Sequence, residues 1–373
     1  MEEDLKLSKQ KVDNFLKLWN NTDMDIDNSF RNKVIFLTGG TGFVGTTLIK
    51  HLYEYNCKIY CIVRDGKDGT SAKERLDNIL KILDIKENVY LIKGDYYKPQ
   101  MGISDEDWDM LCKKVDIIFH LGCRTSFTMD YDKSRFSMIM PTLTMLELSL
   151  LDHKKLMIYG GSCISKLANK YEGMYGLHKG YCCGKYVVHN LLNYFNEKSG
   201  NIKIMYMGYT QSLESDGYYG YKDSLEEIMF LALKTNNFPR FDMYIDYADM
   251  NEICKKLLKR KIDEIPSSIG VHCREPIHWS TLYEPMLKVN PKLKKVEKEI
   301  FFEGLSEIYE KYPLLSYMGE GKKEGVMTYD FEDQMNRLFA KETIPENNME
   351  ISTPDINFFE KLFEELNEYF ETS

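Results

Sequence analysis

The chain has 373 residues, of which 43% are hydrophobic and 13% aromatic, so it is long enough to bury one large core or two smaller ones. Its 58 acidic residues outnumber 49 basic ones, which gives a formal net charge of -9 and a pI near 5.5. This balance excludes a global positive field, so we expect neither nucleic acid nor a membrane surface as a partner. The sequence shows no secretion signal and no bilayer-length apolar segment, so we expect a cytoplasmic protein.

The nine cysteines and seven histidines do not form a recognisable metal-binding pattern. The cysteines lack paired zinc-site spacings, and the closest two, Cys182 and Cys183, are adjacent in sequence. Reduced thiols and no metal are therefore expected.

Residues 1–32 are polar and acidic with a weak helical stripe, and we expect a helix or a linker there. From residue 33, short β-rich segments alternate with amphipathic segments of helical length, the pattern of a parallel sheet flanked by helices. The predicted strands are 34–37, 58–63, 89–92, 116–120, 156–159, 202–206 and 268–273. The predicted helices are 44–54, 71–84, 105–114, 133–151, 181–197 and 248–260. The fold class is therefore α/β, with a doubly wound parallel sheet.

The alternation weakens after residue 207, which predicts a second unit. Residues 276–373 have the pattern of helices joined by loops, for example at 342–355. We expect this stretch and residues 208–245 to form a smaller, mainly helical subdomain over the carboxyl edge of the sheet, where open α/β folds bind ligands. Residues 33–207 form the first unit, completed by about 246–275.

The most specific motif is the glycine-rich segment at residues 38–45, which follows an apolar strand and opens a helix. Glycines at this spacing allow a tight turn, a close backbone approach to a pyrophosphate and close packing of helix on strand. The motif predicts a Rossmann-type dinucleotide-binding domain. Its candidate cofactor-binding residues are Gly39, Thr41, Gly42, Phe43, Val44 and Gly45.

The end of the second predicted strand indicates which dinucleotide is bound. Arg64, helped by Arg75, suits the 2′-phosphate of NADPH, whereas NAD-selective sites usually carry a carboxylate here. Asp65 follows directly and is the alternative, which would favour NADH. We predict NADPH.

Two further strand ends carry candidate cofactor-binding residues. Asp95, followed by Tyr96, ends the third strand, and its carboxylate is predicted near the adenine amino group. Small residues after the fourth strand, at Leu121, Gly122 and Cys123, leave room for the dinucleotide. Either segment also fits an ordinary strand-end turn.

A Tyr-x-x-x-Lys pattern occurs twice, as Tyr175 with Lys179 and as Tyr181 with Lys185. Side chains at i and i+4 share one helix face, so the lysine ammonium can lower the pKa of a proton-donating phenol and hold the nicotinamide ribose. The second copy opens an apolar helical stripe, whereas Gly176 interrupts the first. Tyr181 and Lys185 are therefore the predicted catalytic and cofactor-binding pair, and the first copy is the alternative.

A hydroxyl at the end of the fifth predicted strand completes the catalytic set. Ser162 is predicted to hold the substrate oxygen together with Tyr181, and Ser165 is the alternative.

These segments together resemble the extended short-chain dehydrogenase/reductases, and within them the thioester reductase domains that end nonribosomal peptide synthetases and carboxylic acid reductases. The resemblance runs from about residue 34 to the C-terminus. It implies an NADP-binding Rossmann domain, a substrate-binding subdomain, and NADPH-dependent reductive release of an acyl or peptidyl thioester as an aldehyde. The implied partner is a phosphopantetheinylated carrier protein. No adenylation or carrier signature is present, so the chain is expected to be a monomer or a module of a larger synthetase.

Three features depart from the family pattern. The stretch between Ser162 and Tyr181 is short, Met138 stands where the family often has an asparagine, and residues 206–208 replace an Arg-Pro-Gly-like segment beside the nicotinamide. Two other functions remain open: a nucleotide-sugar epimerase or dehydratase of the same superfamily, and a non-catalytic NADP(H)-sensing protein.

Overall fold

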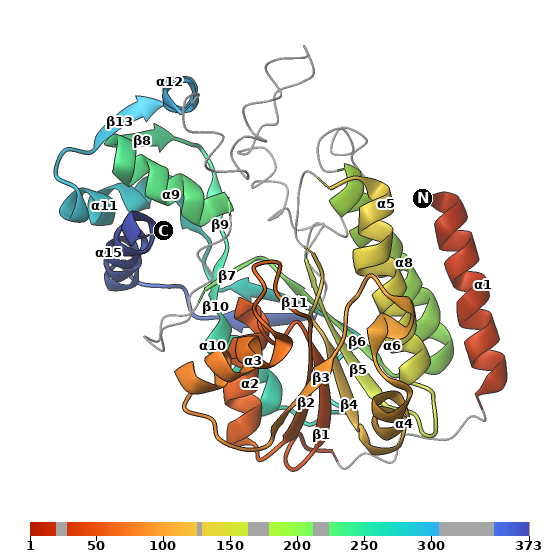
Figure 1. Ribbon diagram of the computed structural model, residues 1–373. Helices are drawn as coiled ribbons and strands as arrows, with labels where there is room; N and C mark the ends of the chain where they lie inside the picture. The colour runs from red at the N-terminus through yellow and green to blue at the C-terminus, as the bar shows by residue number, and fades with distance from the viewer. Residues whose placement is uncertain (20–27, 125–128, 163–178, 212–223, 306–346, 373) are drawn as a thin grey trace.

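The computed structural model describes residues 1–19, 28–124, 129–162, 179–211, 224–305 and 347–372. Its centre is an eight-stranded sheet in the order β14-β11-β6-β5-β4-β1-β2-β3, with every neighbouring pair parallel (Figure 1). The strands are β1 (Val34–Thr38), β2 (Lys58–Val63), β3 (Val89–Lys93), β4 (Ile117–His120), β5 (Leu156–Ser162), β6 (Ile202–Met207), β11 (Ser268–Cys273) and β14 (Asn348–Ile351). The first six follow the Rossmann order 3-2-1-4-5-6, which confirms the predicted fold class.

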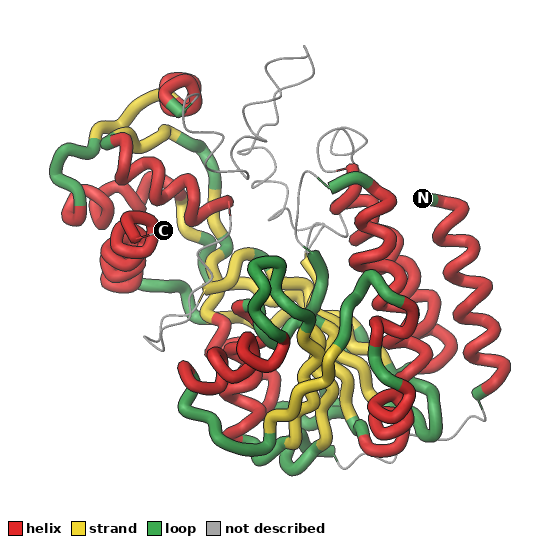
Figure 2. The backbone as a smooth tube through the Cα atoms, in the orientation of Figure 1, coloured by secondary structure: helices red, strands yellow, loops and turns green. Residues whose placement is uncertain are grey.

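Helices cover both faces of the sheet, which explains why central strands such as β4 are buried throughout (Figure 2). One face carries α1 (Glu2–Leu18), α4 (Asp105–Lys114), α5 (Tyr131–Ser134), η2 (Arg135–Ile139), α6 (Met140–Leu148) and α8 (Lys179–Ser199). The other face carries α2 (Phe43–Glu54), α3 (Ala72–Ile82) and α10 (Met250–Leu258). A separate apolar core lies on each face.

The seven predicted strands are all present, but two findings differ from the prediction. Strand β5 continues to Ser162, three residues past its predicted end. The predicted loop at 342–355 is wrong for Asn348–Ile351, because these residues form β14 and pair with β11. Only Met349 and Ile351 point inward from β14, and two alternating apolar residues give too weak a signal to predict an edge strand.

The second unit lies beyond the β11 side of the sheet (Figure 1). Its elements are α9 (Ser224–Thr235), β8 (Asn237–Arg240), β9 (Tyr244–Ile245), β12 (Ile277–His278), η4 (Trp279–Leu282), α11 (Tyr283–Val289), β13 (Lys294–Glu297), α12 (Lys298–Gly304) and α15 (Ile356–Thr372). Buried Trp279 packs on Phe238 and Phe241, and its indole N–H donates to the Pro239 carbonyl at 2.7 Å. Strands β7 (Tyr209–Gln211) and β10 (Tyr247–Asp249) pair where this unit joins the sheet.

Within the described residues, no helix combines the length and apolar character that a bilayer span requires.

Candidate active site

The glycine-rich segment forms the tight turn between β1 and α2. Gly39 has φ +80°, which L side chains rarely adopt, and its carbonyl accepts the Gly42 N–H at 3.0 Å. A Cβ at Gly45 would lie 2.2 Å from the Gly39 carbonyl oxygen, so only glycine permits this helix start. Gly42 is the N-cap of α2, which begins with Phe43 and Val44. The turn therefore presents the helix N-terminus that an anionic pyrophosphate needs.

The turn is fixed to the end of β4 by one threonine. The Thr38 hydroxyl oxygen accepts the N–H groups of Leu121 and Gly122 at 3.1 and 2.9 Å. The Tyr96 hydroxyl fills the space over Gly122, where a Cβ would lie 1.9 Å from it. Four predicted cofactor residues from three strand ends thus lie together: Gly39, Tyr96, Leu121 and Gly122.

The two predicted phosphate-binding arginines are neighbours. The Arg75 guanidinium donates to the Arg64 carbonyl at 2.8 Å and to the Thr41 hydroxyl at 3.3 Å, and the Arg64 side chain is exposed. The competing carboxylate has other partners, because Asp65 accepts the Ala72 N–H at 2.9 Å and pairs with Lys93 at 2.8 Å. Lys93 and then the Ala72 N–H hold the pKa of Asp65 below its usual value. Asp65 therefore already has two partners, and the role of Arg64 in cofactor selectivity stays a prediction.

Asp95 lies at the end of β3, as predicted, and has a local partner. Its carboxylate accepts the Tyr97 N–H at 3.1 Å, which closes a turn after the strand. The predicted contact of Asp95 with adenine stays a prediction.

A buried chain of hydrogen bonds links the glycine turn to α6. The Thr38 hydroxyl lies 2.9 Å from Nδ1 of His120, and Nε2 of His120 lies 3.1 Å from the Thr142 hydroxyl, which donates to the Met138 carbonyl at 2.7 Å. This order assigns the Nε2–H tautomer, because Thr38 already accepts two backbone N–H groups. Burial, and then Lys185, lowers the pKa of His120 to about 3. His120 is therefore a neutral structural link.

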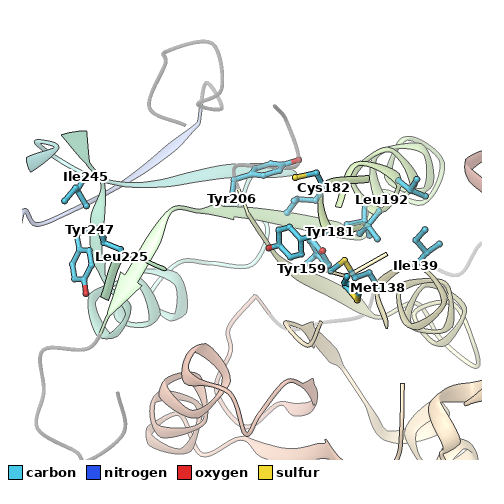
Figure 3. Packing of buried hydrophobic residues seen from close by; sticks show 14 of the residues in the cluster. Met138, Ile139, Tyr159, Tyr181, Cys182, Leu192, Tyr206, Leu225, Ile245 and Tyr247 are labelled. Atoms are coloured by element: carbon cyan, nitrogen blue, oxygen red, sulfur yellow. The ribbon is translucent and has the colours of Figure 1, made fainter. Parts of the chain in front are cut away.

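Tyr181 and Lys185 lie in the first turns of α8 and are 5% and 4% exposed. The Lys185 ammonium donates to Cys123 Sγ at 3.3 Å and to the Tyr159 hydroxyl at 3.4 Å, and it lies 5.7 Å from the centroid of the Tyr181 ring. Figure 3 shows Tyr159 and Tyr181 side by side between β5 and α8. Tyr159 was absent from the predicted site, although it stands only three residues before Ser162.

Electrostatics couple these groups. Burial raises the pKa of Tyr181 and of Tyr159, and the Lys185 charge opposes both shifts. Burial disfavours the charged form of Lys185, but Cys123, Tyr159 and Tyr181 hold its pKa above the usual value. A protonated lysine next to a protonated phenol is the arrangement that proton donation requires.

Other members of the predicted catalytic set are only partly described. The backbone of Ser162 ends β5 and pairs with Met207 of β6, but its side chain lies outside the described residues. Ser165 and Tyr175 also lie outside them, as does the Lys179 side chain.

Met138 lies within η2, a single π-helical turn of the kind often found at functional sites. The Ser134 hydroxyl approaches its sulfur at 3.6 Å, and a Cβ at Gly184 would lie 1.9 Å from that hydroxyl and 3.1 Å from the sulfur. The small size of Gly184 therefore allows α8 to pack closely on α5 and η2.

The family model described as "Male sterility protein" matches residues 37–239, more than half of the chain. The chain belongs to this family. The family model describes an NAD-binding domain, so the cofactor of this protein is a nicotinamide dinucleotide. The glycine turn fits such a group, because Gly42 caps α2 without a side-chain hydrogen bond, so the N-terminus of the helix can receive an anionic pyrophosphate.

The relatives of this chain include an aminoadipate reductase and a carboxylic acid reductase, as the sequence resemblance predicted. The L-2-aminoadipate reductase large subunit of Candida glabrata is 22% identical over 61% of the chain, and the carboxylic acid reductase of Segniliparus rugosus is 27% identical over 34%. The chain spans only 19% and 12% of their lengths.

Solved structures show the same fold along almost the whole chain. The terminal R domain from the myxalamid PKS-NRPS pathway matches with a TM-score of 0.74 at 17% identity, covering 97% of this chain and 98% of that domain. A thiolation-reductase di-domain from an archaeal non-ribosomal peptide synthetase matches with a TM-score of 0.64 at 17% identity, covering 99% of this chain and 81% of that one.

Proposed function

We propose that this protein is an NADPH-dependent thioester reductase that releases an acyl or peptidyl group from a carrier protein as an aldehyde. The observation that carries the proposal is the buried Tyr181–Lys185 pair, which contacts Tyr159 on the strand that ends at Ser162. The relatives named as aminoadipate and carboxylic acid reductases support a carboxyl-level substrate over a sugar.

Each group of residues has a separate role in the proposed reaction. The glycine turn and the N-terminus of α2 bind the pyrophosphate, Arg64 and Arg75 bind the 2′-phosphate, and Lys185 binds the ribose. NADPH supplies the hydride when bound. Tyr181 donates a proton to the substrate oxygen, and the Ser162 hydroxyl holds that oxygen. Thioester, NADPH and a proton together give aldehyde, free thiol and NADP⁺.

The proposed partner is a carrier protein whose phosphopantetheine arm bears the thioester. This partner is supported by the archaeal thiolation-reductase di-domain, whose name joins a carrier to a reductase of the same fold. The substrate-binding unit, 208–245 with 276–373, is proposed to select the acyl chain.

The test is to measure NADPH oxidation with acyl-pantetheine thioesters of different chain types, next to nucleotide sugars as the control substrates. We expect oxidation that depends on the thioester. Turnover of a nucleotide sugar instead would assign the protein to the epimerases, and tight NADPH binding without any turnover would assign it to the sensing proteins.

Cofactor selectivity gives a separate prediction. Arg64→Ala should weaken NADPH binding roughly 10- to 150-fold, since a hydrogen bond to a charged group contributes about 1.5–3 kcal/mol. NADH binding should change little, because NADH lacks the 2′-phosphate. Lys58→Ala, at the opposite and exposed end of β2, is the matched control. Equal losses for both dinucleotides would remove Arg64 from the phosphate site.

A further inference from the structure

The ammonium of Lys185 is a buried charge. None of the ion pairs within the described ranges includes Lys185, although it is only 4% exposed. Leaving a buried charge without compensation costs several kcal/mol. Among the described residues, neutral groups contact the ammonium and determine where it points.

One of those neutral groups is the hydroxyl of Tyr159 on β5, which accepts from the ammonium at 3.4 Å. Cys123 accepts a second N–H at 3.3 Å. An ammonium has three donors, so this geometry leaves one of them for a ligand.

Tyr159 is itself rigidly held. It is 7% exposed and stands in register with His120 on β4, and the two ring centroids are 5.6 Å apart. Because His120 is neutral, it adds no second positive charge beside Lys185.

Met138 of η2 packs against Gly184, the residue before Lys185. Its thioether accepts from the Ser134 hydroxyl and has no proton to donate. The described polar contacts of the ammonium thus come from Tyr159 of β5 and from Cys123 in the loop after β4.

We propose that Tyr159 is a positioning residue that fixes the Lys185 ammonium, so that its third N–H faces the cofactor ribose and its charge stays beside Tyr181. The roles of Lys185 and Tyr181 in this inference rest on the proposed function.

The test is Tyr159→Phe, which keeps the ring and removes the hydroxyl acceptor. NADPH fluorescence titration without any thioester should show a dissociation constant raised by roughly tenfold, as expected for loss of a hydrogen bond to a charged group. Tyr194→Phe is the control. It removes a tyrosine hydroxyl from α8, the helix of Lys185, but this hydroxyl lies far from the site, where it donates to Asp13 at 2.8 Å. The NADPH dissociation constant of this variant should stay unchanged.

The pH profile gives a readout that a purely structural role would not move. Reduction needs the protonated phenol of Tyr181, so kcat falls as the pH rises through its pKa. The positive charge of Lys185 lowers the pKa of Tyr181, and this effect weakens when the ammonium is no longer fixed beside the phenol. Tyr159→Phe should therefore shift the alkaline limb of the kcat profile to higher pH.

Cys123→Ala is the second variant, for the case that Tyr159→Phe does not fold. Cys123 is half-buried in a strand-end loop, and its loss should raise the NADPH dissociation constant in the same direction. The inference is overturned if the folded variants bind NADPH as tightly as the unsubstituted protein. Because binding is measured without thioester, this outcome is separate from any failure to reduce thioesters.

Discussion

Replacing Tyr181 by phenylalanine should lower kcat for thioester reduction by roughly 100- to 10,000-fold, the usual contribution of a positioned general acid. The ring is almost fully buried and keeps its apolar contacts in α8, so the protein should stay folded. The phosphate-binding residues are untouched, so NADPH affinity should be nearly unchanged. Steady-state kinetics together with a fluorescence titration measure both quantities.

Tyr175→Phe is the matched control, because Tyr175 begins the other copy of the Tyr-x-x-x-Lys pattern. It should have little effect on turnover. If Tyr175→Phe abolished turnover and Tyr181→Phe did not, the catalytic role would belong to Tyr175 and Lys179.

Substituting Gly45 by alanine should weaken NADPH binding by roughly tenfold to a hundredfold and lower the melting temperature. The added Cβ would lie 2.2 Å from the Gly39 carbonyl oxygen and 2.7 Å from Gly40 Cα. Both atoms belong to the backbone, so the clash is relieved only if the turn and the start of α2 move apart. Isothermal titration and thermal unfolding report the two effects.

Gly200→Ala separates lost stability from lost binding. Gly200 follows α8 with φ +69°, and its Cβ would meet open space, so the substitution adds only backbone strain of about 1–2 kcal/mol. It should lower the melting temperature and leave NADPH binding intact. Normal NADPH binding by Gly45→Ala would show that the turn does not hold the pyrophosphate.

The predictable parts of the molecule are those that neighbouring residues determine. The strands buried on both faces are largely apolar, and the turn at Gly39–Gly45 needs its glycines for local steric reasons, so the sequence alone predicts both. The Tyr181–Lys185 pair is likewise a matter of helical spacing within four residues.

The features that sequence reasoning missed depend on contacts between distant segments. Tyr159 meets Lys185 only because β5 lies against α8, and nothing in its local sequence distinguishes it from a core tyrosine. The position of Gly184 against Ser134 is equally a product of helix packing. Strand β14 is specified by its pairing with β11, more than 70 residues earlier in the chain.

The most direct test of the account is the stoichiometry of one reaction. The purified protein is given an acyl or peptidyl pantetheine thioester and excess NADPH, and free thiol, oxidised cofactor and aldehyde trapped by a carbonyl reagent are measured early and late. For a two-electron thioester reductase, we expect one NADPH to be consumed for each thiol released, with aldehyde as the main product and alcohol as a minor one. Two NADPH consumed per thiol with no aldehyde trapped at any time would contradict the two-electron release, and thiol release without NADPH oxidation would contradict reduction altogether.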